Sequence, residues 1–443
     1  MSALRVASVL AALGLMGAAT AAVADDNTDF AVPNYYGRGK NTSVMERERP
    51  DYDAVGIHAG GFTLFPKLQL GVIATSNILD VPNAPSAVPP TSPKSAFGFL
   101  IAPSVTAQSN WGRHSLTVTA NVQQETFTQF SSENQTTGGI RADGQIDVHD
   151  ESYIDLGGDI ERDVIARGGT TSQTTEAKPV PYNTETAYAR GVYGVDRVRG
   201  TVEGDFANYD FLNVPRVGGG TVTEDVRNYS QDRGLGRVDY ALSPDAAVFG
   251  SVSYGLENYA EGTLINPARN SHETRILAGA NFDLTALARG EIGIGYVDRE
   301  YTASSFYHPL KGLAISSKIE YFPTQLVTVT FIGQRLVEDS AFNQASGYFK
   351  NFASLGADYE FKRNIILSLL GSLERDTFEG ISRTDNTASI AASGKYLVNR
   401  NVGVGATLAY TNRVSSIGAG LPADEIGPVY NEVRFTLNLV LQR

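Results

Sequence analysis

Hydrophobic and polar residues alternate with a period of two along almost the whole 443-residue chain. Successive side chains of a β-strand point to opposite faces, so this pattern predicts strands with one apolar and one mostly polar face. The clearest example lies near the C-terminus, where every second residue is apolar: Val433, Phe435, Leu437, Leu439 and Leu441. Similar stretches occur around residues 116–123, 140–148, 248–257 and 402–411. They run for about ten to fourteen residues, roughly twice the length of a typical strand.

Short turn-forming segments recur about every 40 residues, which is the spacing of two membrane-length strands with one tight turn and one longer loop. The sequence predicts these turns at 111–113, 150–151, 195–196, 243–245, 284–286, 322–324, 362–364 and 399–401. Longer segments rich in Gly, Ser, Thr, Asn and Pro alternate with them, at 79–95, 130–138, 168–182, 212–228, 258–271, 338–347 and 415–427. We therefore expect short turns at one end of the sheet and long loops at the other.

The number of turns predicts the architecture. Eight short turns join 16 strands in pairs, and one strand at each end, 67–76 and 431–442, raises the count to about 18, with 16 as the alternative. We predict an all-β fold, a transmembrane antiparallel up-and-down β-barrel over residues 57–443, and at this size a barrel encloses water. A soluble β-propeller repeats at a similar length but uses four short strands per blade. The long strands here favour the barrel.

Aromatic residues support a membrane location. Five of them lie on the apolar face just before five successive short turns: Tyr240, Phe282, Tyr321, Tyr359 and Tyr396. Aromatic rings at one level form the interfacial girdle of a transmembrane barrel, whereas packing in a soluble core would place them anywhere along the strands.

The N-terminus predicts export. Residues 1–24 have a basic start, an apolar run rich in Leu and Ala, and a small-residue site before Asp25, which is the pattern of a secretory signal peptide. Residues 25–56 are polar and predict an N-terminal arm on the periplasmic side, either as a disordered leader or as a partial plug that enters the pore from below. An even strand number places both termini in the periplasm of a Gram-negative cell, with the barrel in the outer membrane.

Strand alternation assigns charged residues to the lumen. We expect an acidic arc formed by Asp143, Asp147, Asp155, Asp159, Glu161 and Asp163. We expect arginines from the following strands to face it, namely Arg190, Arg197, Arg199 and Arg237. Separated arcs of opposite sign would orient polar solutes, whereas pairing between neighbouring strands would stiffen the wall.

Composition excludes other functions. The formal net charge is −12, which does not favour binding to nucleic acid. The chain has no cysteine, and its five histidines show no metal-ligand spacing, so we expect no metal and no cofactor. No nucleophile elbow or phosphate-binding loop is present, and we expect no enzymatic activity.

The segment 44–57 contains Arg49-Pro50, Tyr52-Asp53 and Gly56-Ile57, and it is followed by Gly61 to Pro66 and by Ser76-Asn77-Ile78. These motifs resemble the start of the putative β-barrel porin 2 family. The resemblance implies a Gram-negative outer-membrane barrel. It also implies a role as the outer-membrane pore of an exopolysaccharide export system.

The pattern and the resemblance together predict a passive channel for hydrophilic solute, with exopolysaccharide export as the specific expectation. One alternative is a diffusion porin for small nutrients, which predicts a loop folded into the lumen, with 168–182 as the candidate. Another is a non-conducting structural or adhesive barrel, which predicts a lumen blocked by the arm. The expected partners are outer-membrane lipid, the barrel assembly machinery and periplasmic polysaccharide-export proteins, the last through residues 25–56.

Overall fold

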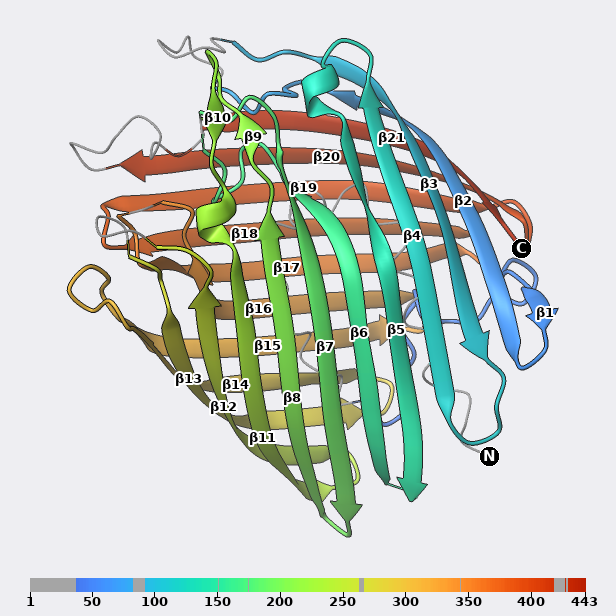
Figure 1. Cartoon of the computed structure of the whole chain (residues 1–443). Helices are drawn as coiled ribbons and strands as arrows, with labels where there is room; N and C mark the ends of the chain where they lie inside the picture. The colour runs from blue at the N-terminus through green and yellow to red at the C-terminus, as the bar shows by residue number, and fades with distance from the viewer. Residues whose placement is uncertain are drawn as a thin grey trace.

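The computed structural model describes residues 37–82, 92–149, 151–173, 175–262, 267–342, 344–417, 427 and 429–443, so the predicted signal peptide and residues 25–36 lie outside the described residues. Within these ranges, eighteen long antiparallel strands form one closed sheet, which also includes the short strand β1 (Ile57–Ala59) (Figure 1). The predicted β-barrel is confirmed, with 18 strands rather than 16.

The wall strands follow one another around the barrel in sequence order. The first seven are β2 (Phe62–Thr75), β3 (Ala96–Ser109), β4 (Ser115–Phe127), β5 (Gln135–His149), β6 (Ser152–Ile165), β7 (Val180–Val195) and β8 (Val198–Phe211). The next six are β11 (Tyr229–Ser243), β12 (Ala246–Tyr259), β13 (Ser271–Leu284), β14 (Ala288–Tyr301), β15 (Leu310–Thr324) and β16 (Val327–Asp339). The last five are β17 (Gly347–Lys362), β18 (Ile365–Glu379), β19 (Arg383–Leu397), β20 (Val402–Ile417) and β21 (Tyr430–Gln442).

The barrel closes where its first and last strands meet. β2 pairs with β21 from Lys67↔Gln442 to Thr75↔Arg434. The first strand was expected to begin at Lys67, but β2 begins at Phe62 because its first residues pair with β1 instead of with β21.

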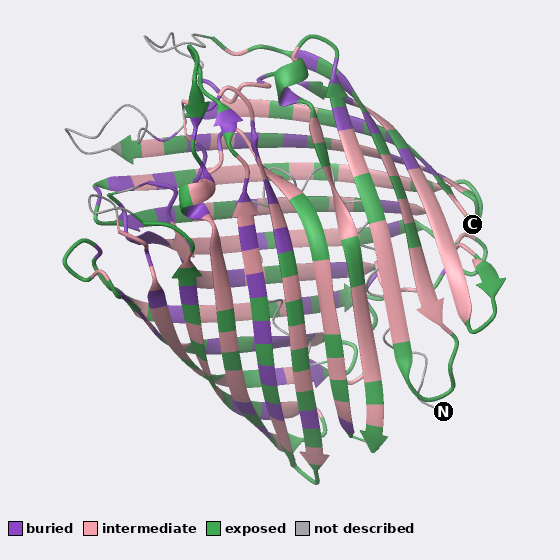
Figure 2. Ribbon diagram, in the orientation of Figure 1, coloured by how far each residue is buried: buried purple, intermediate pink, exposed green. Residues whose placement is uncertain are grey.

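Alternation along the strands separates the two faces of the wall, and Figure 2 shows it as a repeating change of exposure. On β21, Phe435 and Leu437 are exposed, whereas Thr436 and Asn438 are buried. An apolar side chain that faces away from the barrel is exposed in the isolated protein and meets lipid in a membrane. The five aromatic residues predicted as a girdle lie on this outward face near the short turns, and Tyr240, Tyr321, Tyr359 and Tyr396 are exposed.

The two ends of the barrel differ. All eight predicted short turns lie between strands at one end, which we call the turn end, and the longer connections lie at the loop end. Two loop-end connections, 302–309 and 380–382, were not predicted. The turn between β7 and β8 is so tight that Asp196 takes a φ of 51°, a left-handed conformation that aspartate tolerates better than most residues.

The loop end carries additional small elements inside and above the mouth. They are the 3-10 helices η2 (Ser131–Glu133) and η3 (Asp225–Arg227), together with a hairpin of β9 (Val214–Pro215) and β10 (Thr221–Val222). Apolar residues there form several small clusters; one joins Val214 and Val222 to Ile165 and Phe211. No helix within the described residues is long and apolar enough to span a membrane.

Candidate functional site: the barrel interior and its two mouths

Charged residues concentrate on the concave face of the wall, opposite the exposed apolar residues. Arg237 of β11 forms an ion pair of 2.7 Å with Glu291 of β14, although β12 and β13 lie between these strands. Side chains that reach past two strands meet on the inside of a curved sheet. We call this face the interior.

The predicted acidic residues lie on two adjacent strands. Asp143 and Asp147 belong to β5, and Asp155, Asp159, Glu161 and Asp163 belong to β6. Their positions alternate with exposed Ile140, Ile154 and Ile160, so they share the interior face. Several accept hydrogen bonds from side chains of β7, such as Asp143 from the Tyr188 hydroxyl at 3.0 Å and Asp159 from the Thr186 hydroxyl at 2.6 Å.

The four predicted arginines differ in their location and in their ion pairs. Arg190 lies between Asp155, at 3.5 Å, and Glu203, and Arg237 pairs with Asp239 and Glu291. Arg197 is exposed in the turn after β7, and Arg199 follows on β8. Contacts such as that of Arg190 with Asp155 join adjacent strands, which is the arrangement that stiffens the wall.

At the loop end, the connection between β6 and β7 crosses the mouth of the barrel. We call its described residues, 166–173 and 175–179, the crossing loop. The Thr170 hydroxyl donates to Asp376 Oδ2 of β18 at 2.6 Å and accepts from Arg413 Nη2 of β20 at 2.9 Å, and its carbonyl accepts from Arg383 Nη2 of β19. In the sheet order, β20 is separated from β6 by β5, β4, β3, β2 and β21. The loop therefore reaches a distant part of the wall.

The residues that receive the crossing loop form one buried polar network. Asp385 accepts hydrogen bonds from both Arg383 and Arg413, and both ion pairs are buried. Thr170 is 1% exposed. Hydrogen bonds to ionised partners in such a dry setting are stronger than those between neutral groups, so the loop is held at a defined point.

The other half of the crossing loop packs on the β9–β10 hairpin. Ala177 donates its N–H to the Pro215 carbonyl at 2.8 Å, and Val217 donates to the Thr175 carbonyl at the same distance. Glu176 is buried between these segments. Burial, and secondarily the nearby Glu224 carboxylate, raise the pKa of Glu176 to about 7.

At the turn end, residues 37–56 run along the inside of the rim, and we call them the inner arm. Asp283 anchors their start: its carboxylate accepts from the Arg38 N–H at 2.7 Å and from the Asn41 side chain at 2.7 Å. The Asn41 side chain in turn accepts from the N–H of Ala286, which has a φ of 54° in the turn after β13. The inner arm thus supports a turn with a strained backbone.

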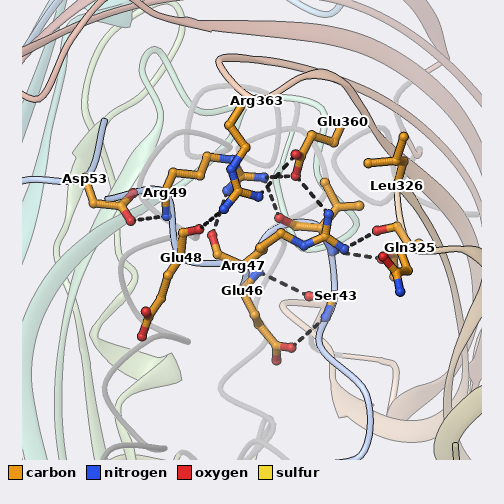
Figure 3. Close-up of polar contacts among 12 residues, drawn as sticks. Ser43, Glu46, Arg47, Glu48, Arg49, Asp53, Gln325, Leu326, Glu360 and Arg363 are labelled. Carbon is orange, nitrogen blue, oxygen red and sulfur yellow. Dashed lines mark hydrogen bonds and ion pairs between the residues drawn. The ribbon is translucent and has the colours of Figure 1, made fainter. Parts of the chain in front are cut away.

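Ion pairs hold the middle of the inner arm (Figure 3). Arg47 and Arg49 both pair with Glu360 at the end of β17, at 3.2 and 3.1 Å. Arg363, in the next turn, donates to the Glu48 carbonyl at 2.8 Å. Burial lowers the pKa of Arg49, and the Glu360 carboxylate opposes this effect. These contacts fix the inner arm to the interior side of the rim.

The last part of the inner arm reaches the closure of the barrel. Arg400, in the turn between β19 and β20, donates to the Pro50 carbonyl at 2.8 Å. Gln442 of β21 donates to the Tyr52 carbonyl at 3.4 Å. The inner arm therefore follows the rim from β13 to β21 before it enters β1.

The interior offers polar and charged groups for solutes, arranged between two internal segments. In the parts of the chain that the structure describes, no group of three His, Cys, Asp or Glu side chains is placed to hold a metal ion. Sequence reasoning named the segment of the crossing loop but not Thr170, Asp376 or Arg413, because alternation assigns a face and not a contact across the lumen. For the inner arm, the charged residues of segment 46–49 were the one sequence feature that could have indicated its ion pairs with the rim.

The chain is similar to known proteins in one family and in several solved structures. The family described as "Putative beta-barrel porin 2" matches residues 49–442. Among solved structures, OccK2 (OpdF) of Pseudomonas aeruginosa is similar at 8% identity, with 86% of this chain and 98% of that chain covered and a TM-score of 0.44. OccAB3 of Acinetobacter baumannii is similar at 11% identity, with 86% and 99% covered and a TM-score of 0.44. OpdK of P. aeruginosa with vanillate is similar at 8% identity, with 86% and 99% covered and a TM-score of 0.45. No curated protein sequence matches this chain.

Proposed function

This chain belongs to the Putative beta-barrel porin 2 family and is a porin-like outer-membrane barrel, and on that premise we propose that it is a passive channel for small hydrophilic solutes. The observation that carries the proposal is the attachment of Thr170 in the crossing loop to Asp376, Arg383 and Arg413 on a distant part of the wall. A loop held across the mouth of a wide barrel narrows it while leaving the wall intact. The crossing loop thereby limits the size of the solutes that can pass.

The orientation is part of the proposal. The predicted export signal, the even strand number and the short turns support a turn end in the periplasm and a loop end outside the cell. Both ends of the barrel domain, β1 and β21, then start and finish on the periplasmic side, and the crossing loop meets solutes arriving from outside.

Export of an exopolysaccharide, which the family resemblance suggests, makes a different demand on the same loop. A long polymer occupies the mouth of the pore continuously while it is exported. The crossing loop would therefore have to stay detached at Thr170 for the whole of transport. The buried ion pairs around Thr170 oppose that release. The small-solute channel needs no such release, and the geometry favours it.

A reversible tether tests the proposal. The chain has no cysteine, so Thr170→Cys with Asp376→Cys introduces one reactive pair at side chains that are 2.6 Å apart. The purified double variant would be placed in liposomes with the pair bridged by a disulfide or by a short thiol crosslinker, and then again after release. Swelling in mono- and disaccharides and in a large dextran measures passage. Thr170→Cys alone is the control.

The proposal predicts that small sugars pass with the loop tethered, and that only the released loop admits larger solutes. If tethering stops the small sugars as well, the crossing loop is a closed lid and the proposal is wrong. If the barrel carries no current or solute in either state, even after deletion of residues 25–56, it is a non-conducting structural barrel. Loss of secreted polymer on deletion of the gene, without loss of sugar uptake, would establish export instead.

A further inference from the structure

The wall of the barrel parts between two strands at the loop end. β15 stays paired with β14 as far as Leu310, and β16 stays paired with β17 as far as Asp339. Between β15 and β16 themselves, pairing ends at Ile315↔Arg335. The first residues of β15, 310–314, and the last residues of β16, 336–339, therefore separate. We call this opening the seam.

The β16 side of the seam lies inside the β15 side. Val337, two residues after Arg335, is 5% exposed and packs in a cluster with Leu310, Ala314 and Val297. These three belong to the interior surface of β14 and β15, so the end of β16 is tucked behind them. On the interior side, the seam is filled by the side chains of this cluster. On the outward side, it opens toward the membrane surface.

Arg335 lies at the point where the strands part. Its Nε donates to the Leu313 carbonyl of β15 at 3.0 Å, and Nη1 donates to Asn351 Oδ1 of β17. Its guanidinium carbon lies 4.3 Å from the centre of the Phe349 ring. Arg335 thus donates a hydrogen bond to a backbone carbonyl on the edge of β15 that borders the seam. Within the described residues, its contacts include no carboxylate.

A second arginine lies in the same row across the strands. The register pairs Arg335 with Asn351 and Asn351 with Arg375 of β18, and the Asn351 side chain donates to the Arg375 carbonyl at 3.0 Å. Arg375 is exposed on the outward face, two residues beyond Leu373, which is 65% exposed. Among the residues that the structure describes, its guanidinium has no ion pair. Two cations thus lie at the upper edge of the apolar surface without a counter-charge.

This differs from the interior, where arginines on the wall strands pair with carboxylates. Such pairs are formed by Arg190, Arg233, Arg237, Arg289, Arg299, Arg383, Arg413 and Arg434. On the outward face near the seam, Lys311 likewise pairs with Asp298 and Glu300. The described part of the chain thus supplies carboxylates for many of its cations but none for Arg335 and Arg375. At a membrane boundary, lipid headgroups supply the anions for such residues.

We propose that Arg335 and Arg375 bind a phosphate group of the glycolipid that forms the outer leaflet of the outer membrane. The proposal rests on the orientation given under Proposed function, which places the loop end in that leaflet. Guanidinium groups match phosphate through paired N–H donors. Within the described residues, Nη2 of Arg335 and the guanidinium of Arg375 have no hydrogen-bond or ion-pair partner. The acyl chains of the glycolipid then cover the exposed Leu373, Leu355 and Phe331 below.

The test measures glycolipid binding to purified, delipidated full-length protein by native mass spectrometry. The probe is lipid A carrying two phosphates, compared with the same glycolipid after dephosphorylation and with inorganic phosphate. The variants are Arg375→Gln, which leaves the contacts at the seam in place, and the double variant with Arg335→Gln. The matched control is Arg162→Gln, which removes an exposed arginine from β6, away from the seam. Heat-modifiable gel mobility reports whether each variant is folded.

We expect Arg375→Gln to weaken binding of the phosphorylated glycolipid on the order of tenfold, because a charge-assisted hydrogen bond is lost, and the double variant to weaken it further. Arg162→Gln should bind like the wild type, and dephosphorylated glycolipid should bind wild type and double variant equally weakly. Unchanged binding by Arg375→Gln, or equal binding of the two glycolipids to the wild type, would overturn the proposal. Solute passage does not enter this readout, so its outcome is independent of the channel function.

Discussion

Thr170→Val should free the crossing loop. Valine has nearly the shape of threonine but lacks the hydroxyl that donates to Asp376 and accepts from Arg413. The hydrogen bond from charged Arg413 contributes about 1.5–3 kcal/mol and the one to Asp376 about 1 kcal/mol, and the two share one atom, so we expect a loss of about 3 kcal/mol in loop attachment. That loss raises the ratio of detached to attached loop roughly a hundredfold.

Single-channel recording in planar bilayers measures this change. The attached loop gives the main conductance, and detachment gives larger openings because the mouth is wider. Thr170→Val should make the larger openings roughly a hundredfold more frequent at the same voltage. The ionic strength should be kept constant, because screening of the interior charges would change the current independently.

The same loop provides a matched control. The Thr175 hydroxyl is buried and has no hydrogen-bond partner among the described residues, so Thr175→Val removes an equivalent group without breaking a described contact. This control should leave the openings as in the wild type. If Thr170→Val and Thr175→Val behave alike, the contacts of Thr170 do not hold the loop, and the reasoning on size restriction fails with them.

Three further outcomes are expected. Asp283→Ala removes the anchor of the inner arm, with a loss of about 2–4 kcal/mol of contacts, and should make the arm sensitive to trypsin. Asp245→Asn, which changes the exposed ion-pair partner of Lys40, should leave the arm protected. Glu176 favours attachment of its loop when protonated, so attachment should weaken by about 3 kcal/mol as pH rises from about 4.5 to about 7, and Glu176→Gln should remove this pH dependence of conductance. Arg237→Gln removes the ion-pair partner that buried Asp239 and Glu291 share and should lower the free energy of unfolding by about 3–5 kcal/mol, measured from urea midpoints by gel mobility.

Much of the barrel could be predicted from sequence because a wall strand interacts mainly with its neighbours and with lipid. The alternation from Val433 to Leu441 directly predicts which side chains face outward, and turn residues such as those at 195–196 predict where strands end. The start of β2 could not be predicted, because pairing of Phe62 with Ala59 of β1 depends on how the inner arm enters the wall. The 380–382 connection is short enough to resemble a turn and was missed.

The candidate site was harder to predict than the wall, because its contacts join segments that are far apart in sequence. Thr170 and Arg413 are 243 residues apart, and Arg47 and Glu360 are 313 apart. Nothing in the spacing of either pair indicates that the two residues meet. Strand alternation placed the charged residues on a face, but which of them pair is determined by strand neighbours, as for Arg190 with Asp155.

The route of the inner arm has a consequence for how the barrel stays closed. The join between β2 and β21 brings the two ends of a long chain together over nine residue pairs, and closing so large a loop is entropically costly. The inner arm is continuous with β1 and β2, and it grips β13, β17, the β19–β20 turn and β21 itself. While these contacts hold, the first and last strands stay at a high effective concentration for each other, so the inner arm lowers the entropic cost of keeping the barrel closed.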